Sequence, residues 1–242
     1  MLITSKDNSR IKHLRKLLDK KVSMNEGLFV IEGENLVFEA IKNGLLTELY
    51  LLDGVENIFN FECNYVTLDV MKSISSLSST SRVVGVSKYI NKNKLGKRVI
   101  LLDNIQDPGN VGTIIRNAVA FNIDSVVFSK GCASPYNDKV LRSTGGMIYN
   151  INIIIDDLEH VINELHSNNI NVYGTSLKAS VGLESIPKTD EYAICFGNEG
   201  NGISENILNL CDKNIRIDMS DKCESLNVGV SSGIVLYYMF KR

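Results

Sequence analysis

Residues 98–118 read RVILLDNIQDPGNVGTIIRNA and join two patterns in one stretch. The apolar run at residues 99–102 is typical of a buried strand, and a helix is expected to start near Asn110. Apolar side chains recur at helical spacing from Val111 to Ala118, so this helix should turn one face to a core. A buried strand that leads into a helix is the repeating unit of a parallel sheet covered on both faces. The stretch therefore predicts an α/β fold.

The same alternation extends to both sides of this stretch. Toward the C-terminus, strands are predicted at residues 125–128, 151–155, 171–174 and 192–196, with a helix at 157–167. Toward the N-terminus, a strand at residues 28–31, a helix at 33–44 and a strand at 49–52 predict a smaller α/β unit. The polar, glycine-containing residues 91–97 are the best candidate for a linker. We therefore expect two domains, residues 1–94 and residues 98–242.

Composition favours an ordinary globular protein of one large or two small domains. Hydrophobic residues make up 44% and charged residues 22% of the 242 residues. No apolar run is long enough to cross a bilayer, and the N-terminus lacks the apolar stretch of a signal peptide, so we expect a cytoplasmic protein without membrane contact. The five cysteines form no CxxC pair, which argues against a disulfide framework and against a metal site.

Basic residues gather at the N-terminus, where residues 1–21 hold seven Lys and Arg against two Asp. The pattern predicts one helix over residues 10–21, with Lys12, Lys16 and Lys20 in a stripe opposite its apolar side. Such a stripe suits contact with RNA phosphates. The alternative is a solvated helix face without a ligand, and the charge pattern alone favours this alternative.

Residues 228–240, VGVSSGIVLYYMF, predict a helix that is apolar all round. Such a helix must be buried on all sides. A subunit interface and a central helix within one chain explain the pattern equally well. At an interface, Val235 and Tyr238 would contact the partner, and the small residues 231–233 would let its helix approach closely.

Two further polar segments lie between predicted strands and helices. Residues 196–203, FGNEGNGI, hold three glycines in six positions, which lets a ligand lie against the backbone. This loop is neither GxGxxG nor a P-loop, so a nucleotide-phosphate site is not supported. Residues 217–228, IDMSDKCESLNV, lead into the terminal helix, which Ser225 or Asn227 could cap.

Taken together, these segments resemble the SpoU/TrmH family of RNA ribose methyltransferases. The family pattern N-x-G-x-x-x-R-N-A stands at residues 110–118, G-N-E-G-x-G at 197–202, and S-L-N-V at 225–228. Residues 142–146, RSTGG, are similar to an arginine-containing turn of the family. Residues 29–33, FVIEG, resemble the substrate-binding domain that often precedes the catalytic one.

The resemblance implies a trefoil-knotted C-terminal domain that binds S-adenosylmethionine and needs no metal. It implies a cofactor site at Thr175, Ser176, Leu177, Gly197, Ile217, Met219 and Leu226. It implies a catalytic site at Arg116, supported by Asn110, Glu199, Ser225 and Asn227. Because an arginine is normally always protonated, we expect Arg116 to anchor an RNA phosphate rather than act as the base. The RNA contacts are expected at Lys12, Lys16, Lys20 and Arg142.

The expected activity is methyl transfer from S-adenosylmethionine to a ribose 2′-hydroxyl of large-subunit (23S) ribosomal RNA. Transfer RNA is the alternative substrate, and a non-catalytic RNA-binding or ribosome-assembly protein is the alternative class. A nucleotide-dependent Rossmann enzyme is disfavoured because GxGxxG is missing. The resemblance also implies a homodimer built through the C-terminal helix.

Overall fold

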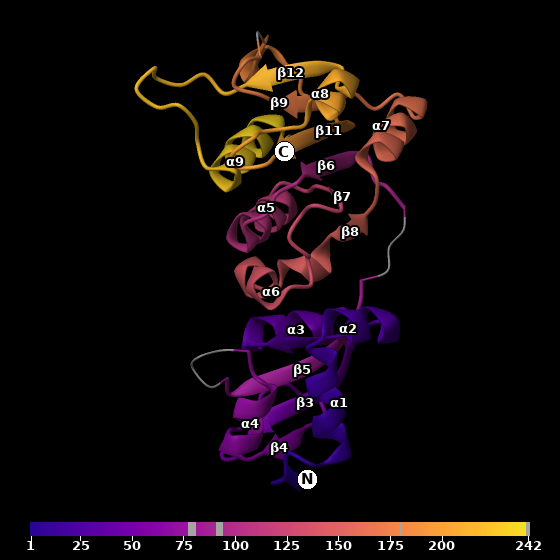
Figure 1. The fold of residues 1–242 in the computed structure, drawn as a ribbon, viewed down its shortest axis with the longest axis vertical. Helices are drawn as coiled ribbons and strands as arrows, with labels where there is room; N and C mark the ends of the chain where they lie inside the picture. The colour runs from indigo at the N-terminus through magenta and orange to yellow at the C-terminus, as the bar shows by residue number, and fades with distance from the viewer. Residues whose placement is uncertain (77–80, 91–93, 180, 241–242) are drawn as a thin grey trace. The chain divides into compact units, whose positions relative to one another are not determined.

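The protein was analysed as a computed structural model, which describes residues 1–76, 81–90, 94–179 and 181–240. The chain divides into two compact units, Met1–Ile90 and Asn91–Arg242. Part of the predicted linker, residues 91–93, lies outside the described residues. Figure 1 shows the path of the chain through both units.

The first unit is a five-stranded mixed sheet with helices on both faces. Its elements are β1 (Leu2–Ile3), α1 (Ser9–Leu17), α2 (Lys20–Glu26), β2 (Leu28–Glu32), α3 (Glu34–Lys42), β3 (Leu46–Leu52), β4 (Asn64–Val66), α4 (Leu68–Ile74) and β5 (Val83–Lys88). The strand order is β1-β4-β3-β5-β2, and β5 runs antiparallel to both of its neighbours. Helices α1 and α4 pack on one face of the sheet, in a cluster with the buried Tyr50 and Val84.

The basic N-terminal segment forms two helices and not one. Helix α1 ends at Leu17, and the Asp19 side chain accepts hydrogen bonds from the backbone N–H groups of Lys21 and Val22, which caps a second helix. Lys20 is the first residue of that second helix. The predicted stripe of three lysines on one helix is therefore wrong, because a local cap ends its regular spacing.

The second unit is a seven-stranded sheet in which every strand pair is parallel. Its elements are β6 (Arg98–Asp103), α5 (Pro108–Ala120), β7 (Ser125–Phe128), α6 (Asp138–Thr144), η1 (Met147–Asn150), β8 (Asn152–Ile155), α7 (Leu158–Ser167), β9 (Val172–Thr175), β10 (Val181–Gly182), η2 (Leu183–Ser185), β11 (Tyr192–Gly197), α8 (Glu205–Leu210), β12 (Lys213–Arg216) and α9 (Val228–Met239). The strand order is β10-β12-β9-β11-β6-β7-β8. The predicted α/β class with a mostly parallel sheet is confirmed.

Helices cover both faces of this sheet, as Figure 1 shows. Val99 and Leu101 of β6 pack in one cluster with apolar side chains of α7 and α8. The alternate residues Ile100 and Leu102 are also fully buried, which a strand needs when it is covered on both sides. Helix α5 begins at Pro108, two residues before the predicted start, because Asp107 caps it. The trefoil knot stays a prediction.

The terminal helix α9 is not buried all round within one chain, so the central-helix alternative is wrong and the subunit interface stays a prediction. Val235, Leu236 and Met239 are almost fully buried, whereas Tyr237 is 71% exposed. Val235 belongs to the chain's own core, and the Tyr238 hydroxyl donates a hydrogen bond to the carbonyl of Glu184 at 2.8 Å. Val235 is therefore not available to a partner, whereas a partner contact at the half-buried Tyr238 stays a prediction.

The small residues of α9 face α5 of the same chain. A Cβ on Gly229 would lie 2.9 Å from Thr113, and Ser232 is fully buried. The Asn117 amide on α5 donates to the carbonyl of Gly229 and to the Ser232 hydroxyl, both at 2.9 Å. One carboxamide thus fixes the register of the two helices, and the expectation that residues 231–233 admit a partner helix is wrong for Ser232.

The packing of α5 on α6 depends on Gly112, and Gly112→Val should destabilise the second unit by about 1–3 kcal/mol. A Cβ there would lie 2.2 Å from the Ser143 Cβ and 3.0 Å from the Ser143 carbonyl carbon, so helix α6 must move. Urea unfolding measures the loss. Ala120→Val, an exposed position of the same helix, is the control and should change stability much less. Equal effects of both substitutions would contradict the packing argument.

Candidate active site

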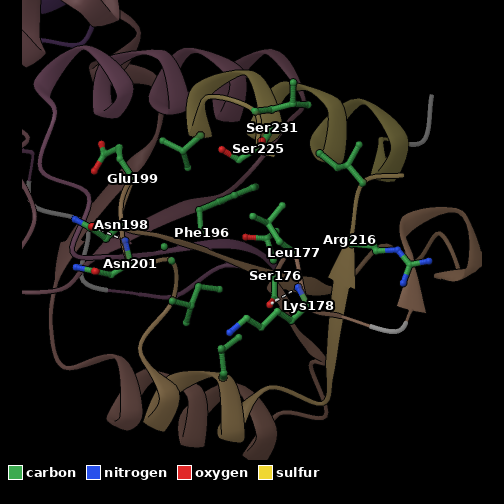
Figure 2. A pocket seen from close by; sticks show the side chains of 18 of the residues that line it. Ser176, Leu177, Lys178, Phe196, Asn198, Glu199, Asn201, Arg216, Ser225 and Ser231 are labelled. Atoms are coloured by element: carbon green, nitrogen blue, oxygen red, sulfur yellow. Dashed lines mark hydrogen bonds between the residues drawn. The ribbon is translucent and has the colours of Figure 1, made fainter. Parts of the chain in front are cut away.

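Loops that follow β9, β11 and β12 enclose a cavity of about 880 Å³ (Figure 2). The C-terminal ends of parallel strands are where ligands bind in open α/β sheets. The cavity is lined by every residue of the predicted cofactor site, namely Thr175, Ser176, Leu177, Gly197, Ile217, Met219 and Leu226. The fold therefore gathers these dispersed residues around one space.

The glycine loop after β11 closes tightly on itself. The backbones of Asn198 and Gly202 exchange two hydrogen bonds, of 3.0 and 2.9 Å, and Gly202 has a φ of 71°. The Asn198 side-chain oxygen accepts from the backbone N–H groups of Gly200 and Asn201. A Cβ on Gly197 would lie 2.1 Å from the backbone nitrogen of Ile203. Gly197 is thus required by the loop's own backbone, in addition to any ligand.

A chain of hydrogen bonds links the three sequence segments that carry the family motifs. The Asn227 amide donates to the Asn110 side-chain oxygen at 2.9 Å, and the Asn110 amide donates to the Glu199 carboxylate at 2.9 Å. Glu199 also accepts from the backbone N–H groups of Gln106, at 3.3 Å, and Asp107, at 3.2 Å. The loop before α5 therefore meets Glu199 directly, and Asn110 joins Asn227, which lies 117 residues further along the chain, to the same network.

The hydrogen bonds keep Glu199 ionised. Burial by itself would raise the pKa of Glu199. The hydrogen bonds from Asn110 and from the backbone N–H groups of Glu199, Asp107 and Gln106 together outweigh burial, so the pKa lies below its ordinary value. The carboxylate accordingly acts as an acceptor at neutral pH and not as an acid.

The other predicted catalytic residues are placed differently. Ser225 and Asn227 line the cavity, and Asn227 also caps α9 by accepting from the backbone N–H groups of Gly229 and Val230. Arg116 lies on the exposed side of α5, outside the cavity lining, and makes no hydrogen bond or ion pair with another described residue. Its guanidinium is available to an anion from outside.

The predicted RNA-contacting residues lie on helices α1, α2 and α6. Arg142 is on α6, where its guanidinium pairs with Asp138 at 2.9 Å. Lys12 pairs with Asp7 at 2.9 Å, while Lys16 and Lys20 are exposed. The three lysines belong to the first unit, and Arg142 belongs to the second.

Three residues near the site were missed from sequence. Asn117 holds α9 on α5, and Lys178 and Arg216 line the cavity. Arg216 donates to the carbonyl of Ala179 at 2.7 Å and so supports the loop after β9. A carboxamide within an apolar helix face was a usable signal for Asn117. Nothing in the sequence pattern marked the two basic residues.

No metal centre or membrane span is found among the described residues. They contain no group of three or more His, Cys, Asp or Glu side chains that could hold a metal ion. None of the described helices is long and apolar enough to span a bilayer.

Comparison with known proteins assigns the chain to a family. The model of the SpoU rRNA Methylase family matches residues 97–237, and the model of the MRM3-like substrate binding domain matches residues 8–85. The chain belongs to the SpoU rRNA methylase family. The predicted resemblance is therefore confirmed.

Three proteins are similar to this SpoU-family chain over nearly their full length. The chain is 33% identical to the 23S rRNA (guanosine(2553)-2′-O)-methyltransferase RlmP of Bacillus subtilis, covering 98% of each protein. It matches the AdoMet-bound rRNA methyltransferase from Sinorhizobium meliloti with a TM-score of 0.86 and 25% identity, covering 99% of this chain and 97% of the other. It matches a TrmH-family putative RNA methyltransferase from Porphyromonas gingivalis with a TM-score of 0.86 and 26% identity, covering 97% and 98%.

The lowered pKa of Glu199 predicts a pH-dependent contribution to stability. A carboxylate with a depressed pKa stabilises the fold above its ordinary pKa, and the contribution is lost as the pH falls through the folded-state value. Glu199→Gln should therefore destabilise the protein at pH 7 more than at pH 3, as measured by urea unfolding at both values. Glu205 is an exposed residue that also lines the cavity. The variant Glu205→Gln is the control, and its effect on stability should be the same at pH 7 and at pH 3. A pH-independent loss for Glu199→Gln would contradict the assigned hydrogen bonds.

Proposed function

We propose that this chain methylates a ribose 2′-hydroxyl of large-subunit ribosomal RNA in the cytoplasm, with S-adenosylmethionine as the methyl donor. The chain is an RNA 2′-O-methyltransferase of the SpoU family. The observation that carries the proposal is the meeting of Asn110, Glu199 and Asn227 at the edge of the 880 Å³ cavity. The relative RlmP, named for 23S rRNA, supports the choice of substrate.

The cavity fits S-adenosylmethionine in size and in polarity. Small-molecule sites span roughly 300–1,000 Å³. The buried side chains of Phe196, Ile215 and Val235 give the cavity an apolar wall suited to adenine. Hydroxyls at Thr175, Ser176 and Ser225, with backbone at Gly197, Ile217 and Leu226, suit the ribose and amino-acid parts. When bound, the cofactor supplies an activated methyl group.

The protein's own contribution is to position and activate the ribose hydroxyl. A hydroxyl is a poor nucleophile at neutral pH, so it needs alignment and loss of its proton during attack. The exposed Arg116 guanidinium can hold an RNA phosphate bidentately and favour the developing negative charge on oxygen. The Asn110 amide is held by Glu199 and the Asn227 amide is held by Asn110, and these bonds keep the loops that border the hydroxyl fixed.

The first unit is proposed to bind RNA. It matches the MRM3-like substrate binding domain, and α1 and α2 present Lys12, Lys16 and Lys20 on their exposed sides. Lys12 and Lys16 lie on α1 and Lys20 lies on α2, so the lysines would contact RNA phosphates from two helices and not from one stripe.

Mapping of ribose methylation in total RNA tests the proposed function. One methylated nucleotide in large-subunit RNA should be absent without the gene and restored by the wild-type gene. A gene-dependent methylated nucleotide in transfer RNA would make transfer RNA the substrate. The absence of any gene-dependent ribose methylation would contradict the proposed activity.

The variant Arg116→Lys separates the effect of charge from the effect of bidentate anchoring, and the rate of methyl transfer to the RNA is measured for it. The variant should bind S-adenosylmethionine with unchanged affinity by calorimetry, and methyl transfer should fall at least about tenfold, because the lysine lacks the planar fork. Methyl transfer at the wild-type rate would contradict bidentate anchoring. Arg98→Lys, outside the site in an ion pair with Asp124, is the control.

We also propose that a second copy of the chain covers the exposed side of α9. Val230, Ile234 and Tyr237 are 52%, 39% and 71% exposed and follow one another at helical spacing. The ring of Phe121 contacts Tyr237 and extends the apolar surface. Contiguous apolar patches of this kind mark interaction sites. Because α9 begins next to Asn227, a partner would lie close to the proposed active site.

Ile234→Asp and Tyr237→Asp should each weaken the dimer strongly, because each places an unpaired charge in an apolar contact, where its desolvation is not compensated. Sedimentation velocity should show a shift to monomer, with a matching loss of methyl transfer. Ile155→Asp, also on an exposed apolar residue of the second unit, should leave the dimer intact. A fully active wild-type monomer at assay concentration would refute the proposal.

A further inference from the structure

A second cavity, of about 280 Å³, lies beside the glycine loop. It shares with the cofactor cavity the residues Asn198, Asn201, Gly202 and Ser204, so the same loop borders both spaces. The rest of its lining comes from the segment that joins β6 to α5, at Asp103, Asn104 and Gln106. In Figure 2, Asn198, Glu199 and Asn201 lie on one side of the cofactor cavity, away from Ser176 and Lys178.

Part of this lining is held rigidly by its own hydrogen bonds. Asp103, only 4% exposed, accepts from the Asn104 amide at 3.1 Å and from the Ser204 backbone N–H at 2.7 Å. Asn198 donates to the carbonyl of Asn104 at 2.8 Å, and its side-chain oxygen accepts from Gly200 and Asn201. The carboxamides of Asn104 and Asn198 thus make the frame of the cavity.

The two remaining carboxamides are unused. The side chains of Gln106 and Asn201 are exposed and form no hydrogen bond with another described residue. Each offers a donor and an acceptor. Their backbones are nevertheless fixed, since the Gln106 N–H donates to Glu199 and the Asn201 N–H donates to Asn198. Two exposed carboxamide side chains among the lining residues therefore stand on loops whose backbones are fixed.

The cavity adjoins the proposed site of methyl transfer. Gln106 is bonded through its backbone to the Glu199 carboxylate, which also binds Asn110. In a nucleotide, the base and the 2′-hydroxyl are attached to neighbouring carbons of the ribose. If the 2′-hydroxyl is presented at the Asn110–Glu199 pair, its base can lie on the side where Gln106 is bonded to Glu199.

We propose that this second cavity holds the base of the target nucleotide and that the carboxamides of Gln106 and Asn201 read its hydrogen-bonding edge. The inference rests on the proposed function and adds a specificity site to it. Unstacked bases in RNA are recognised in this way, by hydrogen bonds to exposed edges within a pocket. Most of the accessible wall of the cavity is apolar, which suits the faces of a base, and a base edge that the two carboxamides do not match would leave donors and acceptors without partners.

The test uses an RNA hairpin built around the nucleotide located by the mapping experiment, made with G, A, U or C at that position. We would measure kcat/KM on all four hairpins for the wild type, Gln106→Ala and Asn201→Ala. Asn163→Ala, an exposed carboxamide on α7, is the matched control. Calorimetry with S-adenosylmethionine on every variant checks that the cofactor site is unchanged.

The wild type should prefer one base by at least about tenfold, the discrimination expected for one or two base-edge hydrogen bonds. Gln106→Ala and Asn201→Ala should each reduce this preference, mainly by lowering kcat/KM on the preferred base, while Asn163→Ala keeps it. Equal methylation of all four hairpins by the wild type, or variants that slow all four by the same factor, would overturn the base pocket and leave the proposed function standing. A wild type that methylates no RNA in the mapping experiment would overturn both.

Discussion

The second unit depends on a chain of hydrogen bonds that ends at one carboxylate and joins three distant segments. Glu199 accepts hydrogen bonds from Asn110 and from the backbone before α5, and Asn110 in turn accepts from Asn227. The glycine loop, the start of α5 and the start of α9 are thereby held in one arrangement. Because both cavities are bordered by these segments, this arrangement sets the shape of the proposed cofactor site and of the space beside it.

Helix α9 has two faces with different tasks. One face carries small residues and meets α5, where the Asn117 amide bonds to Gly229 and Ser232. The opposite face leaves an apolar stripe of Val230, Ile234 and Tyr237 exposed. Since Asn227 caps this helix and also takes part in the hydrogen-bond chain, α9 connects the proposed subunit contact with the site of chemistry.

Local patterns in the sequence predicted most strands and helices, because buried strands and amphipathic helices have distinct periods. The same patterns failed where a short-range cap or a tertiary contact decided the outcome. Asp19 divides the basic N-terminal segment into two helices, although the lysine spacing fits one. The composition of α9 could not show which of its apolar residues the chain itself buries, since Ile234, 39% exposed, and Val235, 1% exposed, look alike in a hydropathy pattern.

By itself the sequence determined the α/β class, the family and the residue types of the proposed site, because short motifs of glycine, carboxamide, carboxylate and arginine are read directly from the order of residues. Only the tertiary structure decided which of these residues meet. Residues 110, 199 and 227 come together because parallel strands end at the same edge of the sheet, and the loops after them converge there. The exposure of Arg116, the unused carboxamides of Gln106 and Asn201, and the apolar stripe of α9 likewise depend on packing between segments far apart in the chain, which no local pattern encodes.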